Sequence, residues 1–133
     1  MHGFEWTTLA TALALMVYLS MGVRVGGARR KYQIAAPAMQ GDPMFERHFR
    51  VQLNTLEWLP VFLPAMWMSA LYWSDQVAAG LGVVWVIGRL IYMVSYVKDP
   101  KTRSLGFLTQ GLATLVLLGG AVWGAATALI HTP

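Results

Sequence analysis

The sequence predicts an all-α integral membrane protein, a bundle of four helices forming a single domain over residues 1–133. Apolar residues make up 56% of the chain and charged residues only 12%, whereas charged residues account for about a quarter of a typical soluble protein. Four apolar stretches are each long enough to cross a hydrocarbon core of about 30 Å, which takes about 20 helical residues. Because the chain has no cysteine, disulfides and thiolate metal ligands are excluded.

The expected spans cover about residues 5–25, 45–73, 77–97 and 101–130. The first has no charge from Trp6 to Val23. It also lacks a preceding basic segment, so we interpret it as a membrane span rather than a cleaved signal peptide. The residues from Gly26 to Asp42, which include glycine, alanine and proline, are expected to form a loop.

Two Asp-Pro pairs predict helix starts, because aspartate is a favoured N-cap and proline is favoured at the first helical position. Asp42-Pro43 begins the second helix, which is long enough for its first turns to project beyond the bilayer. Asp99-Pro100 begins the fourth helix and places Arg103 in its first turn. There the helix dipole would add to the positive field of the guanidinium.

The basic residues predict the orientation. All 10 lysines and arginines lie around the first and third connections between spans, and the two termini and the turn at residues 72–76 have none. By the positive-inside rule, both termini are expected to be non-cytoplasmic and the basic end of the bundle cytoplasmic. We therefore interpret the net charge of +4 as membrane topology and not as a nucleic-acid-binding surface.

Polar residues form two stripes within the spans. At 100° per residue, the stripe on the second helix falls within an arc of about 80°. The stripe on the third helix falls within an arc of about 60°. Ionisable groups are costly inside a bilayer, so both stripes should face the bundle interior or a wet cavity. Gln52 points more than about 100° away from the first stripe, toward a neighbouring helix or subunit. The stripes are Arg47, Arg50, Asn54 and Glu57, and Arg89, Tyr92 and Tyr96.

Simpler interpretations exist for single members of these stripes. Arg47 and Arg50 could extend to the lipid headgroups, and Glu57 could pair with Arg89 as a structural contact. Neither interpretation explains an asparagine and two tyrosines on the same faces. No metal site is expected, because His2, His48 and His131 are isolated from one another and from carboxylates.

The side chains in the stripes favour a small zwitterionic ligand with more carboxylates than amines. Guanidinium groups bind carboxylates through paired hydrogen bonds, and a glutamate binds an ammonium group. A carboxylate-rich peptide fits better than a nucleotide, because no glycine-rich phosphate loop is present.

The run from Phe45 to Pro60 resembles the signature of the MAPEG superfamily, the membrane-associated proteins of eicosanoid and glutathione metabolism. Ala28-Arg29-Arg30, Arg89-Leu90-Ile91-Tyr92 with Tyr96, and Arg103 agree with it in order and spacing. The resemblance covers nearly the whole chain and is closest to the branch of microsomal glutathione transferases and leukotriene C synthase, including bacterial members.

The resemblance implies a homotrimer that binds glutathione, its co-substrate, between neighbouring subunits near the cytoplasmic face. Arg103 would stabilise the glutathione thiolate, and Arg30 would lie near the reacting centre. The implied activity is detoxifying conjugation of glutathione to a hydrophobic electrophile or lipid, with reduction of lipid hydroperoxides as a second reaction. The implied glutathione-binding residues are Arg47, Arg50, Asn54, Glu57, Tyr92 and Tyr96 of one subunit, and Arg29 and Gln52 of its neighbour.

Two other functions stay open at this point: a non-catalytic lipid-binding scaffold of the same fold, and an organic-anion transporter, which would need polar residues throughout the membrane depth. The sequence also departs from the branch pattern. Trp58 replaces a tyrosine, and Leu115 lies near the position of a tryptophan, so leukotriene is not the expected product. Gln52 and Thr55 argue against the prostaglandin-isomerase branch.

Overall fold

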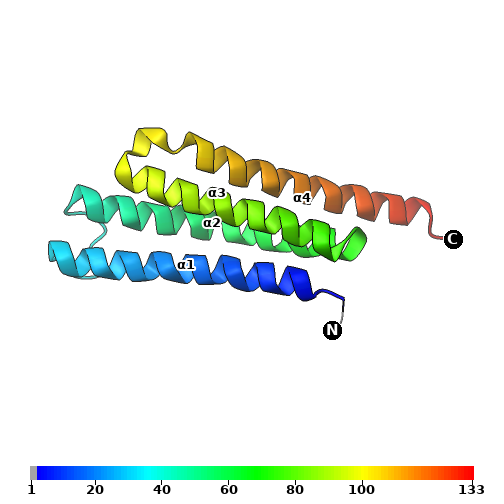
Figure 1. Cartoon of the computed structure of the whole chain (residues 1–133), viewed down its shortest axis with the longest axis horizontal. Helices are drawn as coiled ribbons and strands as arrows, with labels where there is room; N and C mark the ends of the chain where they lie inside the picture. The colour runs from blue at the N-terminus through cyan, green and yellow to red at the C-terminus, as the bar shows by residue number, and fades with distance from the viewer. Residues whose placement is uncertain (1–2) are drawn as a thin grey trace.

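The computed structural model describes residues 3–133, and over that range it contains four long α-helices, one 3-10 turn and no strand. The predicted all-α, four-helix fold is therefore confirmed. The helices run up and down beside one another, and both ends of the chain lie at the same end of the bundle (Figure 1). The elements are α1 (Glu5–Tyr32), α2 (Pro43–Tyr72), α3 (Asp75–Lys98), η1 (Pro100–Thr102) and α4 (Ser104–Ile130).

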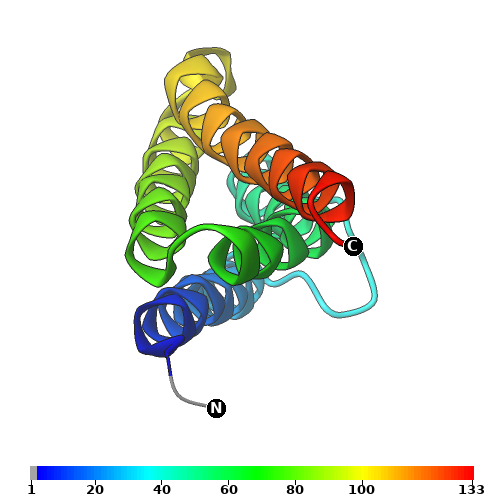
Figure 2. The same cartoon turned by 90° about the vertical axis from the view of Figure 1, so that its right-hand side faces the viewer.

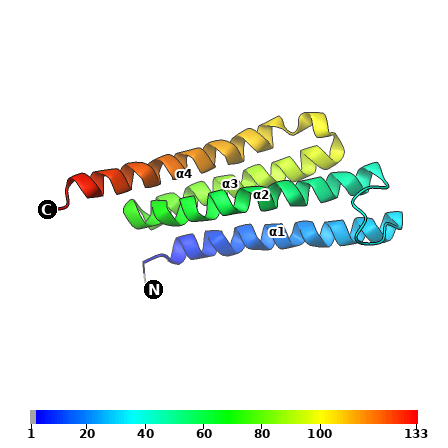
Figure 3. The same ribbon diagram turned by 180° about the vertical axis from the view of Figure 1, so that it is seen from behind.

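The central helices are α2 and α3, each of which packs against all the other long helices. Viewed along the bundle, α1 and α4 lie on opposite sides of this central pair (Figure 2). The α1–α2 connection and the α3–α4 turn lie together at one end (Figure 3). The basic residues of both connections are therefore concentrated at that end of the molecule.

The start of α2 forms as predicted. The Asp42 carboxylate accepts hydrogen bonds from the backbone N–H groups of Met44 at 2.8 Å and Phe45 at 3.3 Å, and Pro43 occupies the first helical position. These contacts satisfy N–H groups that have no partner within the helix. The helix continues through Pro60 and Pro64 to Tyr72.

Two sequence expectations about helix boundaries are wrong. Residues 26–32 are not a loop, because α1 continues to Tyr32 and ends at Gln33, whose φ is 57°. The basic residues of this last turn favour a helical end through the helix dipole. Arg103 does not lie in the first turn of α4, because the Asp99 side chain instead caps the 3-10 turn η1, and Arg103 joins that turn to α4.

Three helical segments are long and apolar enough to cross a membrane, namely α1, α3 and the segment Pro100–Ile130. Large apolar side chains on α1 and α4 are exposed, with Val23 at 76% and Leu129 at 78%, as expected for surfaces that contact lipid. The first half of α2 carries charged residues, and α2 is not among these three. Its role as the fourth span stays a prediction.

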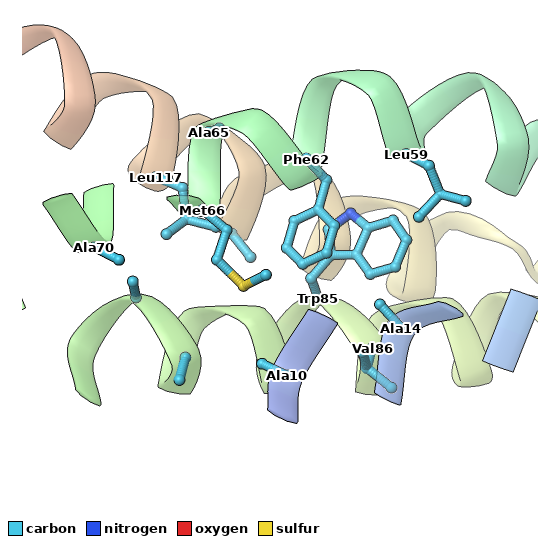
Figure 4. Packing of buried hydrophobic residues seen from close by; sticks show 13 residues of the cluster. Ala10, Ala14, Leu59, Phe62, Ala65, Met66, Ala70, Trp85, Val86 and Leu117 are labelled. Carbon is cyan, nitrogen blue, oxygen red and sulfur yellow. The ribbon is translucent and has the colours of Figure 1, made fainter. Parts of the chain in front are cut away.

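The core is packed around an aromatic pair between the central helices. Phe62 of α2 and Trp85 of α3 stack with ring centroids 4.0 Å apart and planes 2° apart, and Met66 and Leu117 lie beside them (Figure 4). Toward the basic end, α3 and α4 approach closely at Gly106, where an added Cβ would lie 2.7 Å from the Gly88 carbonyl oxygen. This close approach places the start of α4 against Tyr92.

Candidate ligand-binding cleft

A cleft of about 590 Å³ opens between α2, α3 and α4 at the basic end of the bundle. Half of the side chains predicted from the sequence line it, and they come from α2, from α3 and from the turn before α4. They are Arg50, Asn54, Tyr92, Tyr96 and Arg103, joined by Ser104, Phe107 and Leu108. The two helical stripes and the turn therefore converge on one space.

The inner wall of the cleft contains two stacked tyrosines. Tyr92 is 3% exposed, and its ring centroid lies 5.5 Å from that of Tyr96. The Arg89 guanidinium carbon lies 4.3 Å from the Tyr92 ring centroid, within cation–π distance. A buried cation therefore supports this wall from behind.

Arg89 is completely buried, and its hydrogen-bond partners are neutral. Its guanidinium donates to Asn54 Oδ1 at 2.9 Å and to Thr55 Oγ1 at 2.6 Å. The Glu57–Arg89 ion pair that the sequence allowed is not formed, and Glu57 is exposed. Thr55, which the sequence analysis did not include in the site, is a partner of this charge.

The contact with Arg89 determines what Asn54 can offer a ligand. An asparagine amide has one oxygen acceptor and an NH₂ group with two donors. Since Arg89 donates to the oxygen, the NH₂ group is the part of Asn54 that is left to donate in the cleft. The cleft therefore presents hydrogen-bond donors, which suit an anionic ligand.

Two guanidinium groups occupy the rim of the cleft. Arg50 is exposed and makes no ion pair with any residue in the range 3–133. Arg103 is also exposed and donates to the Pro100 carbonyl at 3.0 Å. Because Arg103 directly precedes α4, the partial positive charge of that helix N-terminus adds to its field.

Arg47 lies beside the cleft but is engaged elsewhere. Its guanidinium donates to the carbonyl oxygens of Val97 at 3.0 Å and Lys98 at 3.2 Å, in the last turn of α3. It lines an adjoining cleft of about 570 Å³ that shares Arg50 and Tyr96 with the first. Arg47 thus ties α2 to α3 rather than extending to the lipid headgroups.

The other predicted residues do not line this cleft within one chain. Arg29 donates to the Ala38 carbonyl at 2.7 Å and lies 4.7 Å from the centroid of the Phe45 ring. Gln52 faces α1, since a Cβ added at Gly22 would lie 3.1 Å from its Nε2. Arg30 and Glu57 are exposed and line neither cleft.

No group of three or more histidine, cysteine, aspartate or glutamate side chains that could hold a metal ion occurs among residues 3–133. His2, which entered the metal argument from the sequence, lies outside the described residues.

Comparison with known proteins places this chain in a family. The model of the MAPEG family matches residues 7–123. The chain belongs to the MAPEG family. The recognition from the run Phe45 to Pro60 is therefore confirmed.

This MAPEG chain is similar to proteins from bacteria and mammals. It is 44% identical over 117 residues to the uncharacterized protein sll1147 of Synechocystis sp., covering 88% of this chain and 85% of that protein. It is 41% identical over 101 residues to microsomal glutathione S-transferase 2 of Homo sapiens, covering 75% and 69%. It is 31% identical over 129 residues to leukotriene C4 synthase of Rattus norvegicus, covering 96% and 84%.

The two departures from the branch pattern both adjoin α4 of this MAPEG fold. Trp58 packs edge-on against Phe107 of the cleft, with ring centroids 5.6 Å apart. Leu115 is 62% exposed and lines a shallow apolar groove along α4 with Trp123. One departure thus lies beside a residue of the cleft, and the other lies on an exposed apolar face of α4.

Proposed function

We propose that this MAPEG protein is a membrane glutathione transferase that activates glutathione as a thiolate and conjugates it to hydrophobic electrophiles. One observation carries the proposal: Arg50, Asn54, Tyr92, Tyr96 and Arg103 converge on one cleft. The relatives named as microsomal glutathione S-transferase 2 and leukotriene C4 synthase support it.

Glutathione matches the chemistry of this cleft. The tripeptide has two carboxylates and one ammonium group, and the cleft offers the Arg50 guanidinium, the Asn54 amide donor and two tyrosine hydroxyls. A guanidinium binds a carboxylate through two parallel hydrogen bonds, which fixes orientation as well as position. Glu57, near the cleft on the same stripe of α2, would bind the ammonium group.

The remaining ligand contacts would come from a second copy of the chain in a homotrimer. Arg29 and Gln52 lie on the α1–α2 side of the molecule and line no part of the cleft. If the α1–α2 face of one subunit covers the open cleft of its neighbour, these residues complete the site, and Arg30 approaches the reacting sulfur. The site would lie at the cytoplasmic membrane surface.

Arg103 would keep the glutathione sulfur ionised. An ordinary thiol has a pKa of about 8.5, and the thiolate is the nucleophile. Lowering the thiol pKa by two units requires about 2.7 kcal/mol of preference for the anion. A guanidinium about 4 Å away at an effective dielectric constant near 20 contributes roughly 4 kcal/mol, and the N-terminus of α4 adds to it. The positive charge at the rim of the cleft can therefore supply the free energy needed to lower the thiol pKa by two units.

The proposed conjugation forms one bond and breaks one bond. The thiolate attacks an electrophilic carbon, the carbon–sulfur bond forms, and the leaving group departs with its electron pair. With a lipid hydroperoxide, the thiolate attacks the terminal oxygen and the alkoxide leaves and takes up a proton. A second glutathione then reduces the sulfenic acid to give the disulfide and water. Acceptors dissolved in the bilayer would approach along the exposed apolar face of α4.

The test is turnover by the purified protein with glutathione and an aromatic halide, together with the ultraviolet absorbance of bound thiolate. Arg103→Ala should lower kcat more than it weakens glutathione binding, because the guanidinium interacts more strongly with the anion than with the thiol. Lys101→Ala is the matched control, since Lys101 is an exposed cation in the same turn that does not line the cleft. It should leave both quantities unchanged.

A protein that binds glutathione without a lowered thiol pKa and without turnover would contradict the proposal. That outcome would favour the lipid-binding scaffold. Equal losses in Arg103→Ala and Lys101→Ala would show instead that the net charge of the turn, and not contact with the sulfur, determines the effect.

A further inference from the structure

A small basic pocket lies between α1 and α2, away from the ligand cleft. It has a volume of about 270 Å³, and Arg24, Lys31 and His48 form its polar wall. On α2, His48 and Arg50 point about 160° apart at 100° per residue. The pocket and the glutathione cleft therefore open on opposite sides of α2.

The two cations of this pocket, Arg24 and Lys31, have no anionic partner in the described chain. The side chains of Arg24, Lys31 and His48 make no hydrogen bond or ion pair with residues 3–133, and no carboxylate lines the pocket. The Lys31 ammonium lies 5.4 Å from the Tyr32 ring centroid. The polar wall is thus available to an anion from outside the chain.

The position along α1 indicates where that anion comes from. The uncharged stretch from Trp6 to Val23 is about 27 Å long at 1.5 Å per residue, close to the hydrocarbon thickness of about 30 Å. Arg24 is the first charged residue after this stretch. Leu19 and Val23, just before it, are 66% and 76% exposed. The pocket therefore lies at the depth of lipid phosphates, beside a surface suited to acyl chains.

We propose that this pocket binds the phosphate headgroup of an anionic phospholipid from the surrounding membrane. A purely structural role, in which basic residues stabilise the C-terminus of α1, does not account for Arg24, two turns earlier, or for His48 on another helix. Arg29, proposed above to reach a neighbouring subunit, points about 140° away from Arg24 on α1.

Two neighbouring glycines provide a matched test of this site. Gly27 lines the pocket, and an added Cβ there would meet no atom within 4 Å, so Gly27→Leu should fill the pocket without a clash. An added Cβ at Gly26 also meets no atom within 4 Å, but Gly26 does not line the pocket. The readout is lipid retained by the whole protein in native mass spectrometry, with equimolar phosphatidylglycerol and phosphatidylcholine.

The wild type and Gly26→Leu should retain phosphatidylglycerol preferentially, and Gly27→Leu should lose that preference. Arg24→Gln and Lys31→Gln should each reduce the preference about five-fold, and Lys101→Gln, which removes an exposed charge outside the pocket, should not. These charge variants test the site independently of any folding defect in Gly27→Leu.

Equal retention of the two lipids by the wild type would overturn the proposal. So would an unchanged preference in both Gly27→Leu and Arg24→Gln. A final arm adds inorganic phosphate alone: if millimolar phosphate displaces the lipid, the pocket is a site for soluble phosphate and the assignment to a lipid is wrong. None of these outcomes depends on glutathione turnover, so the result is independent of the proposed function.

Discussion

Thr55→Val tests how the protein stabilises a buried charge behind the cleft. Arg89 is fully buried, and its guanidinium donates to Thr55 Oγ1 at 2.6 Å and Asn54 Oδ1 at 2.9 Å. The substitution keeps the β-branched shape and removes one acceptor. Hydrogen bonds to charged groups contribute about 1.5–3 kcal/mol net, and an unpaired buried donor carries a desolvation penalty. Thr55→Val should therefore be strongly destabilising.

Thr114→Val is the matched control for this experiment. Thr114 is 1% exposed, and its hydroxyl donates to the Gln110 carbonyl at 2.8 Å. Thr55 makes the same bond, one helical turn back, to the Val51 carbonyl at 2.8 Å. Both substitutions remove a buried hydroxyl and its backbone contact, so the difference between them isolates the contact with Arg89. We expect that difference to be about 1.5–3 kcal/mol.

The measurement is the free energy of unfolding in mixed micelles, titrated with sodium dodecyl sulfate and followed by circular dichroism. A double-mutant cycle strengthens it: in an Arg89→Met background, Thr55→Val should cost no more than Thr114→Val, because the buried charge is gone. Equal destabilisation by Thr55→Val and Thr114→Val in the native background would refute the idea that the Thr55 hydroxyl stabilises the guanidinium.

Three further substitutions test the packing and the helix ends. Gly106→Ala should destabilise the fold by about 1–3 kcal/mol and weaken glutathione binding in calorimetry, because the added Cβ meets the backbone of α3; Gly111→Ala, which meets nothing, should do neither. Asp75→Ala should lower the unfolding midpoint, since the carboxylate accepts from the N–H groups that begin α1; Asp75→Asn should lower it less, and an equal shift would contradict the reasoning. Asp42→Ala should cost about 0.5–2 kcal/mol through the lost cap of α2, and an unchanged unfolding midpoint would argue against that contact.

The fold was predictable wherever a boundary depends on neighbouring residues alone. Asp42-Pro43 predicted the start of α2 because both the cap and the proline act within one turn. The end of α1 was not predictable in this way. Ile34, just after it, is buried in a cluster with Val25, Ala28 and Phe45, and no local pattern reveals that packing.

The cleft was predictable in part, because helical periodicity places residues on a common face. It identified Arg50 and Asn54 of α2 and the two tyrosines of α3, which the structure brings together. Periodicity does not give the rotation and axial offset of one helix against another. Those offsets turn Arg47 to the end of α3 and place Thr55, about 100° from Asn54, within reach of Arg89.

The charges around the cleft favour an anionic ligand, whichever individual contacts that ligand makes. The part of the wall supplied by the described residues contains the guanidinium groups of Arg50 and Arg103 and no carboxylate. Arg89 adds a third positive charge behind Asn54 and Tyr92, again with neutral partners. In a partly buried site these fields are weakly screened, so an anionic ligand supplies the counter-charge that the chain omits. The neutral donors of the wall then determine its orientation.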